Sequence, residues 1–80
     1  MRMYTVESFK RGLRVAITRD GCIVDIEKID THQNAPIVGI RRDNYNDRAR
    51  LFWYRNGFWQ PIVSGRLHPI ETRHDLFEVV

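Results

Sequence analysis

Alternation of apolar and polar residues is the clearest pattern in the first part of the chain. Leu13, Val15 and Ile17 are apolar, and the residues between them are polar or small. A period of two predicts a half-buried β-strand, here over residues 13–18. Asp20-Gly21 follows and is typical of a tight hairpin turn, so we expect the next strand to return antiparallel to the first.

The returning strand, predicted over residues 22–30, changes phase along its length. Val24 and Ile26 fall on one face, whereas Ile29 falls on the opposite parity. We expect a β-bulge near Glu27-Lys28, because one extra residue would bring Ile29 back to the core side. A bend of this kind also lets a small sheet curl toward a barrel.

One short helix and four more strands complete the predicted elements. Thr5 can cap a helix over residues 4–11, and Gly12 is a typical stop signal after it. Pro61 has no N–H to offer a ladder, so the strand that contains it should lie at an edge or end there. The four strands are predicted over residues 37–42, 49–54, 58–62 and 75–80.

These elements predict a mainly β fold. We expect a small SH3-like barrel, or a strongly bent antiparallel meander of five to six strands, with one short N-terminal helix. Closing the sheet would remove edges that favour aggregation. A sheet backed by the short helix is the alternative. The chain has 80 residues, so we expect a single domain over residues 1–80.

The stretch 50–60 is the most aromatic part of the chain and holds five of its nine aromatic residues. Asn56-Gly57 in its middle favours a two-residue type I′ turn, because both residues tolerate a positive φ. In the strand before this turn, alternation places Leu51 and Trp53 on the core side. Trp59 lies on the arm that Pro61 makes an edge, and we expect it to remain reachable from solvent.

Arginine dominates the basic residues and gathers around the same stretch. The formal net charge is +3, and eleven of the thirteen basic residues are arginine. Six arginines fall between residues 41 and 66, against two aspartates. Because arginine makes bidentate contacts with phosphate and carboxylate and stacks on aromatic rings, this bias favours a recognition surface. A base-composition effect on codons is the alternative explanation.

If Leu51 and Trp53 point inward, Arg50, Phe52 and Tyr54 share the outer face of the same strand. A row of this kind can stack bases and bind phosphates, or it can form a protein-binding hot spot. It can also be core that packs under the helix or under residues 63–73. The candidate binding residues are Arg41, Arg42, Arg48, Arg50, Phe52, Tyr54, Arg55 and Trp59.

Catalysis and metal binding have little support in the sequence. The three histidines lie far apart and lack the spacing of zinc ligands, and no glycine-rich phosphate loop is present. We therefore expect no enzymatic activity, no cofactor and no metal. Cys22 is the only cysteine, and no apolar run approaches the roughly 18 residues of a membrane span. These features favour a soluble protein of a reducing cytoplasm that does not associate with membranes.

Several short stretches resemble a widespread type of small β-domain protein that bacteriophages and mobile elements encode. The stretches are Lys10-Arg11-Gly12-Leu13-Arg14-Val15, Thr18-Arg19-Asp20-Gly21, Ala35-Pro36-Ile37-Val38-Gly39, Trp53-Tyr54-Arg55-Asn56-Gly57, Glu71 and Asp75-Leu76-Phe77. Residues 42–48 and 58–61 depart from that type. The resemblance implies a compact, β-rich accessory protein and carries over no catalytic residues.

Together, the residues and the resemblance lead to three functional hypotheses. The first is a non-enzymatic accessory protein, a monomer or homodimer in the cytoplasm of a bacterial host, that blocks or modulates a host protein through its Arg/aromatic face. The second is a small β-barrel that binds nucleic acid through the same residues. The third is a sponge that captures a nucleotide messenger.

Overall fold

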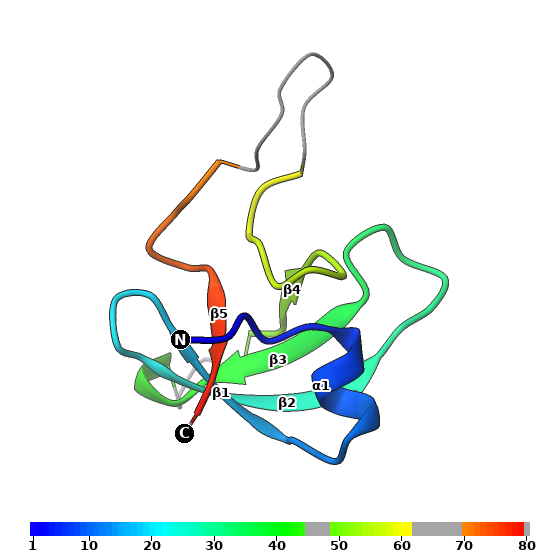
Figure 1. Ribbon diagram of the computed structural model, residues 1–80, viewed down its shortest axis with the longest axis horizontal. Coiled ribbons are helices and arrows are strands. Elements are labelled where there is room, and N and C mark those ends of the chain that lie inside the picture. The colour runs from blue at the N-terminus through cyan, green and yellow to red at the C-terminus, as the bar shows by residue number, and fades with distance from the viewer. Residues whose placement is uncertain (45–48, 62–69, 80) are drawn as a thin grey trace.

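The computed structural model describes residues 1–44, 49–61 and 70–79 of the chain (Figure 1). Five antiparallel strands form one curled sheet, and one short helix lies near the N-terminus. The elements are α1 (Val6–Lys10), β1 (Val15–Thr18), β2 (Ile23–Ile29), β3 (Ile37–Arg41), the 3-10 helix η1 (Arg42–Asn44), β4 (Leu51–Trp53) and β5 (Leu76–Glu78). The prediction of a mainly β fold with one short N-terminal helix is confirmed.

The strands of the sheet follow the order β4-β3-β2-β1-β5. The first four strands form a meander in which each strand pairs with the next along the chain. β5 returns to pair with the free side of β1, and Met3 forms a bridge to Phe77 on its other side. β4 and β5 are therefore the outermost strands of a sheet that curls into a half-barrel (Figure 1).

The β1–β2 hairpin and the bulge in β2 are as predicted. Gly21 has a φ of +91° in the turn, and the pairing of β2 with β3 shifts register between Ile26 and Lys28. Val24 and Ile26 are buried, and Ile29 packs half-buried against the same core. The bulge also leaves Lys28 exposed, although strict alternation from Val24 and Ile26 would have pointed it into the core.

The turn after β4 differs from the predicted two-residue type. The Tyr54 N–H donates to the carbonyl of Phe58 at 3.0 Å, and the Gly57 N–H donates to the carbonyl of Tyr54 at 2.8 Å. These bonds enclose a three-residue loop that ends on Gly57, whose φ is +87°. A type I turn closed by one left-handed residue connects hairpins in this way. The side chain of Asn56 helps to fix the loop, because its Oδ1 accepts the Phe58 N–H at 3.2 Å.

The prediction of a strand over residues 58–62 is wrong for residues 58–61, the part that the structure describes, because these residues form no strand. The Trp59 N–H donates to the carboxylate of Asp75 at 3.0 Å, so it is not offered to a neighbouring strand. Pro61 has no N–H at all, so neither Trp59 nor Pro61 offers a donor to a neighbouring strand. Ile62 lies outside the described residues.

The open side of the half-barrel is joined where three separate segments cross at Gly57. The Leu76 N–H donates to the carbonyl of Gly57 at 2.9 Å, and the Tyr4 N–H donates to the carbonyl of Leu76 at 3.0 Å. The Val6 N–H donates to the carbonyl of Arg55 at 3.1 Å. A Cβ on Gly57 would lie 2.2 Å from the carbonyl oxygen of Tyr4, so only glycine permits this approach.

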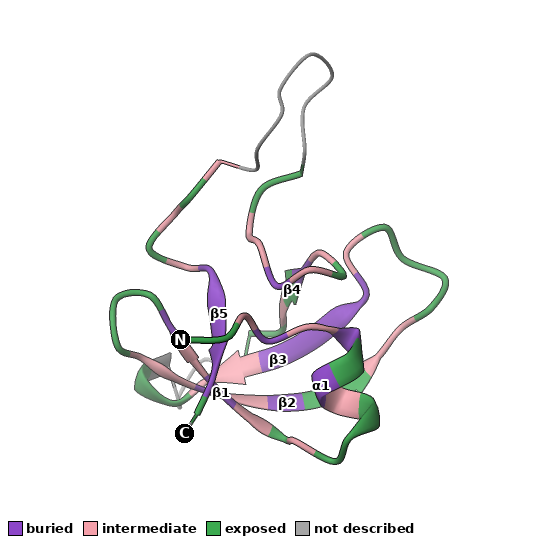
Figure 2. Ribbon diagram, viewed as in Figure 1, coloured by how far each residue is buried: buried purple, intermediate pink, exposed green. Residues whose placement is uncertain are grey.

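All five strands, α1 and the N-terminal segment contribute residues to the core, and Figure 2 marks the buried positions along the ribbon. The largest side chains of the core, Trp53 and Tyr4, are fully buried, and each has a partner for its polar atom. The Trp53 Nε1–H donates to the carbonyl of His74 at 2.7 Å, and the Tyr4 hydroxyl donates to the carbonyl of Leu13 at 2.5 Å. Burial raises the pKa of Tyr4 to about 12, so its hydroxyl keeps the proton that it donates.

Replacement of Gly57 by alanine should destabilise the fold by more than about 2 kcal/mol. The left-handed φ costs an L-residue about 1–2 kcal/mol, and overpacking against the Tyr4 carbonyl adds about 1–3 kcal/mol. Gly21→Ala is the matched control, because Gly21 also has a positive φ but nothing lies within 4 Å of a Cβ there. Denaturant unfolding of both variants measures the difference, and equal losses would contradict the close crossing.

Candidate binding groove

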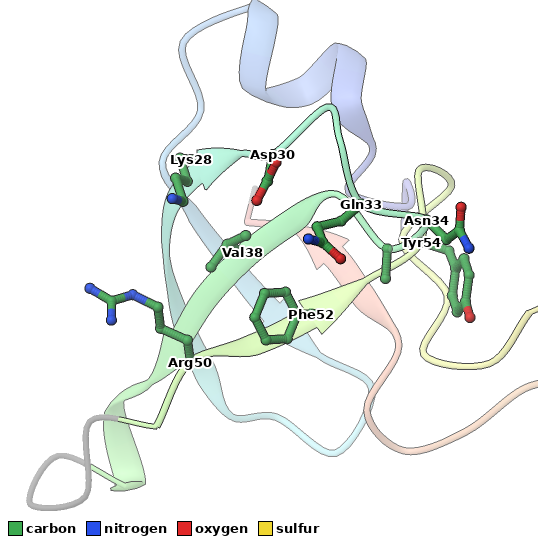
Figure 3. A pocket seen from close by; sticks show the side chains of 9 residues that line it. Lys28, Asp30, Gln33, Asn34, Val38, Arg50, Phe52 and Tyr54 are labelled. Atoms are coloured by element: carbon green, nitrogen blue, oxygen red, sulfur yellow. The ribbon is translucent and has the colours of Figure 1, made fainter.

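An open groove runs over the outer face of β3 and β4, beside the loop that joins β2 to β3 (Figure 3). It consists of two hollows of about 490 and 360 Å³ that share Asn34 and Tyr54. We call the two hollows together the β4 groove. The first is lined by Lys28, Asp30, Gln33, Asn34, Ala35, Val38, Arg50, Phe52 and Tyr54, and the second by Asn34, Tyr54, Arg55, Asn56, Gln60 and Pro61.

Strand register places three residues of the groove side by side. Lys28 on β2 pairs with Val38 on β3, and Val38 pairs with Phe52 on β4. Residues directly opposite each other on antiparallel strands have Cβ atoms about 4.5–5.5 Å apart, so these side chains form one row across the sheet. The bulge in β2 is what brings Lys28 into this row.

Aromatic side chains form the floor of the groove along β4. Trp53 is fully buried, whereas Phe52 is 46% exposed and Tyr54 is half-buried. Leu51 is half-buried and packs against the core. The predicted division by parity is therefore confirmed, with Leu51 and Trp53 facing the core and Phe52 facing outward.

The loop over residues 30–36 forms one wall of the groove. The Asp30 N–H donates to the carbonyl of Pro36 at 2.7 Å, which closes the loop, and the Asp30 carboxylate accepts the His32 N–H at 3.2 Å. Gln33 and Asn34 are exposed, and Figure 3 shows both side chains on the groove side of this loop. Sequence reasoning treated the loop only as a connection, although a polar segment closed by a proline was a visible sign of fixed geometry.

Carboxylates engage most of the arginines that the sequence singled out. Arg42 makes a bidentate contact with Asp25, with N–O distances of 2.8 and 2.9 Å, and Arg50 donates to Glu27 at 2.7 Å. The hydrogen bond from Arg42 holds the pKa of the Asp25 carboxyl below its usual range, against the opposing effect of partial burial. These ion pairs hold β2 to the segments that flank β3 and β4.

Arg41 is also bound by a carboxylate. It makes a bidentate contact with Asp43, at 2.9 and 3.1 Å, and its other terminal nitrogen lies 3.3 Å from Nδ1 of His74. Only 17% of the Arg41 side chain is exposed. Arg41 and Arg42 do not line the β4 groove.

The other predicted residues are divided between the groove, the core and the undescribed part of the chain. Arg55 is exposed and lines the second hollow. Trp59 packs against Trp53, with ring centroids 5.6 Å apart, and against His74, at 4.9 Å. It lines neither hollow, so the aromatic expected to be the most reachable belongs instead to the margin of the core. Arg48 lies outside the described residues.

The carboxylate of Asp75 fixes the segment that carries Trp59. Asp75 is fully buried and accepts hydrogen bonds from the Trp59 N–H, from the N–H and hydroxyl of Thr72, and from the Arg19 guanidinium. Burial by itself would raise the pKa of this carboxyl, but the backbone N–H donors and Arg19 together lower it. Asp75 therefore remains charged in the folded protein at neutral pH.

The described parts of the chain offer no arrangement suited to metal binding or to spanning a membrane. Within residues 1–44, 49–61 and 70–79, no three His, Cys, Asp or Glu side chains are grouped so that they could hold a metal ion. None of the helices in these ranges has the length and hydrophobicity that crossing a bilayer requires. Cys22 is a half-buried free thiol.

Comparison with known proteins found no match to any protein family, to any curated protein or to any solved structure. The description of the groove therefore depends on this chain alone.

Phe52→Ala should leave the protein folded, because the side chain is already half exposed on an outer strand. We expect a loss of about 1 kcal/mol in unfolding free energy, from reduced β-propensity and partial burial. Trp53→Ala, one residue further on, should cost about 3–5 kcal/mol, because it empties a fully buried site. Denaturant midpoints measure both losses, and similar losses for the two variants would show that Phe52 is core.

Acid should destabilise the protein through Asp75. The pKa of this carboxyl lies below its ordinary value of 3.8, so its contribution to stability is complete above about pH 4 and is lost as pH falls through the folded-state pKa. Asp75→Asn should therefore lower stability at pH 7 by about 1–3 kcal/mol and should flatten the decline at acid pH. Urea unfolding at pH 7 and at lower pH measures both effects.

Glu7→Gln is the control for this experiment, because Glu7 pairs with Lys10 and both side chains are mostly exposed. Exposed ion pairs contribute little to stability, so this variant should stay close to the wild type at pH 7. If Asp75→Asn behaved in the same way, the buried carboxylate would have no stabilising role.

Proposed function

We propose that this chain is a non-enzymatic accessory protein that binds a host protein through the β4 groove and thereby blocks or modulates it. The observation that carries the proposal is the 46% exposure of Phe52 on the floor of the groove. A chain of 80 residues has a small core and gains stability from each aromatic side chain that it buries. An aromatic side chain that is instead left half exposed in a groove supports a role in binding.

The surroundings of Phe52 resemble the anatomy of protein interfaces. Such interfaces have an apolar or aromatic centre, a polar rim, and an enrichment in Tyr and Arg among the residues that contribute most to affinity. In the β4 groove, Phe52 lies next to Val38. Arg50 and Tyr54, two residues before and after Phe52, also line the groove. The amides of Gln33 and Asn34 form a polar edge.

Charges beside the groove favour a protein partner over nucleic acid. Arg50 is already paired with Glu27, and Asp30 contributes a carboxylate to the lining. A phosphate backbone would meet these carboxylates, which oppose the electrostatic attraction that nucleic-acid binding depends on. A nucleotide sponge would need an enclosed site, and this groove is open.

The resemblance to bacteriophage and mobile-element proteins supports the rest of the proposal. It makes the cytoplasm of a bacterial host the place of action and a host protein the partner. An SH3-like half-barrel, in a monomer or a homodimer, is the architecture that accompanies this hypothesis.

Affinity capture from a bacterial lysate tests the proposal. Immobilised wild-type protein should retain a defined partner, and nuclease treatment should not release it. Phe52→Ala should lose this partner, because truncation of a central aromatic side chain typically weakens a complex by about 2 kcal/mol or more, roughly thirtyfold in affinity. Val79→Ala is the matched control, since Val79 is 47% exposed but lies beyond β5, outside the groove. This variant should retain the same partner.

Two results would contradict the proposal. A partner that Phe52→Ala retains as well as the wild type does would place binding on another surface. Retention that nuclease abolishes, together with single-stranded oligonucleotide binding that weakens steeply above about 50 mM salt, would identify a nucleic-acid-binding protein instead.

A further inference from the structure

The two ends of the β4 groove carry basic side chains. Lys28 lies at one end, across β3 from Phe52, and Arg55 lies at the other, beyond Tyr54. Among the described residues, neither side chain has an ion-pair partner, whereas Arg50 is neutralised by Glu27. Within the described part of the chain, unpaired positive charge is therefore present at Lys28 and at Arg55, and the charge of Arg50 is compensated.

The backbone fixes the spacing of these charges. Lys28 and Phe52 are separated by two strand intervals, about 10 Å in total. Arg55 begins the loop after β4 and follows Phe52 by three residues, a separation of at most about 10 Å. The first interval runs across the strands and the second runs along β4, so the path from Lys28 to Arg55 bends at Phe52. The Val6 N–H binds the carbonyl of Arg55 at 3.1 Å, so the backbone that presents this side chain is held in place.

The wall of the groove suits the main chain of a peptide. Gln33 and Asn34 each carry a carboxamide that can both donate and accept hydrogen bonds. A peptide backbone presents the same two functions at every residue, so a side-chain amide can bind it in either direction. Figure 3 shows Gln33 beside Phe52 and Asn34 beside Tyr54.

We propose that the β4 groove takes a segment of its partner that bends at an apolar residue, with a carboxylate on each side of the bend. This inference rests on the proposed function and specifies the chemistry of the partner. The apolar side chain packs on Phe52, and the carboxylates pair with Lys28 and Arg55. At about 3.3 Å per residue, each acidic residue lies about three positions from the apolar one.

The lining distinguishes such a segment from a continuous polyanion. Asp30 belongs to the lining and Glu27 lies beside it, bound to Arg50. A nucleic acid carries a charge on every nucleotide and would bring some of them next to these carboxylates. A peptide can restrict its negative charges to the two ends, where the unpaired cations lie.

Selection from a library of random peptides, each about twelve residues long so that the expected spacing fits, tests this inference. Peptides enriched on the wild-type protein should carry Asp or Glu on both sides of an apolar residue. Their affinity, measured by fluorescence anisotropy, should fall about tenfold or more with Phe52→Ala. The double variant Lys28→Glu, Arg55→Glu should lose them as well, and its exposed positions leave the fold intact.

The control is the double variant Arg2→Glu, Lys10→Glu, which changes the net charge by the same amount at exposed positions outside the groove. It should keep the selected peptides, because the groove charges are unchanged. If it lost them to the same extent, attraction by overall charge would replace the specific pairing, and the inference would be overturned.

Other outcomes separate this inference from the proposed function. Enriched peptides that need Phe52 but lack flanking acids would overturn the inference and leave the proposed function standing. Tighter, Phe52-dependent binding of an oligothymidine probe would overturn both. A selection without any Phe52-dependent peptide would overturn the inference alone, since lysate capture tests the proposed function independently.

Discussion

The crossing of three chain segments at Gly57 is the contact on which the rest of this fold depends. The sheet order leaves β4 and β5 at opposite edges, and backbone hydrogen bonds of Gly57, Leu76 and Tyr4 join them there. Only a residue without a side chain lets the Tyr4 carbonyl approach so closely. With the edges joined, Trp53 can be enclosed completely, and its indole N–H reaches the carbonyl of His74.

The groove follows from two local irregularities in this curled sheet. The bulge in β2 turns Lys28 outward, into the row that also contains Val38 and Phe52. The three-residue loop after β4 turns the chain so that Tyr54 and Arg55 continue the floor of the groove. The bulge also returns Ile29 to the core side, and each of the two features positions a side chain of the proposed binding surface.

Local pattern was enough to predict most of the fold. Alternation in residues 13–18, the phase change near Glu27-Lys28 and the parity around Trp53 all depend on neighbours in sequence, and each matched the structure. Apart from the turn at Asn56-Gly57, where the loop has three residues and not two, the errors concern contacts between distant residues. No local signal shows that the Trp59 N–H binds the Asp75 carboxylate rather than a strand, or that Asp25 and Glu27 neutralise Arg42 and Arg50. The groove residues Lys28, Gln33 and Asn34 were missed because tertiary structure alone brings them to Phe52.

The ends of the chain are also joined to each other, and this affects how the protein folds. Glu78 accepts hydrogen bonds from Ser8, at 2.5 Å, and from Arg11, and its own N–H donates to the carbonyl of Arg2. Such contacts span almost the whole sequence, and chains rich in distant contacts fold slowly, because the entropy of closing a long loop must be overcome before a distant contact forms. We therefore expect the nascent chain to stay open until β5 has left the ribosome and then to close in a single cooperative step.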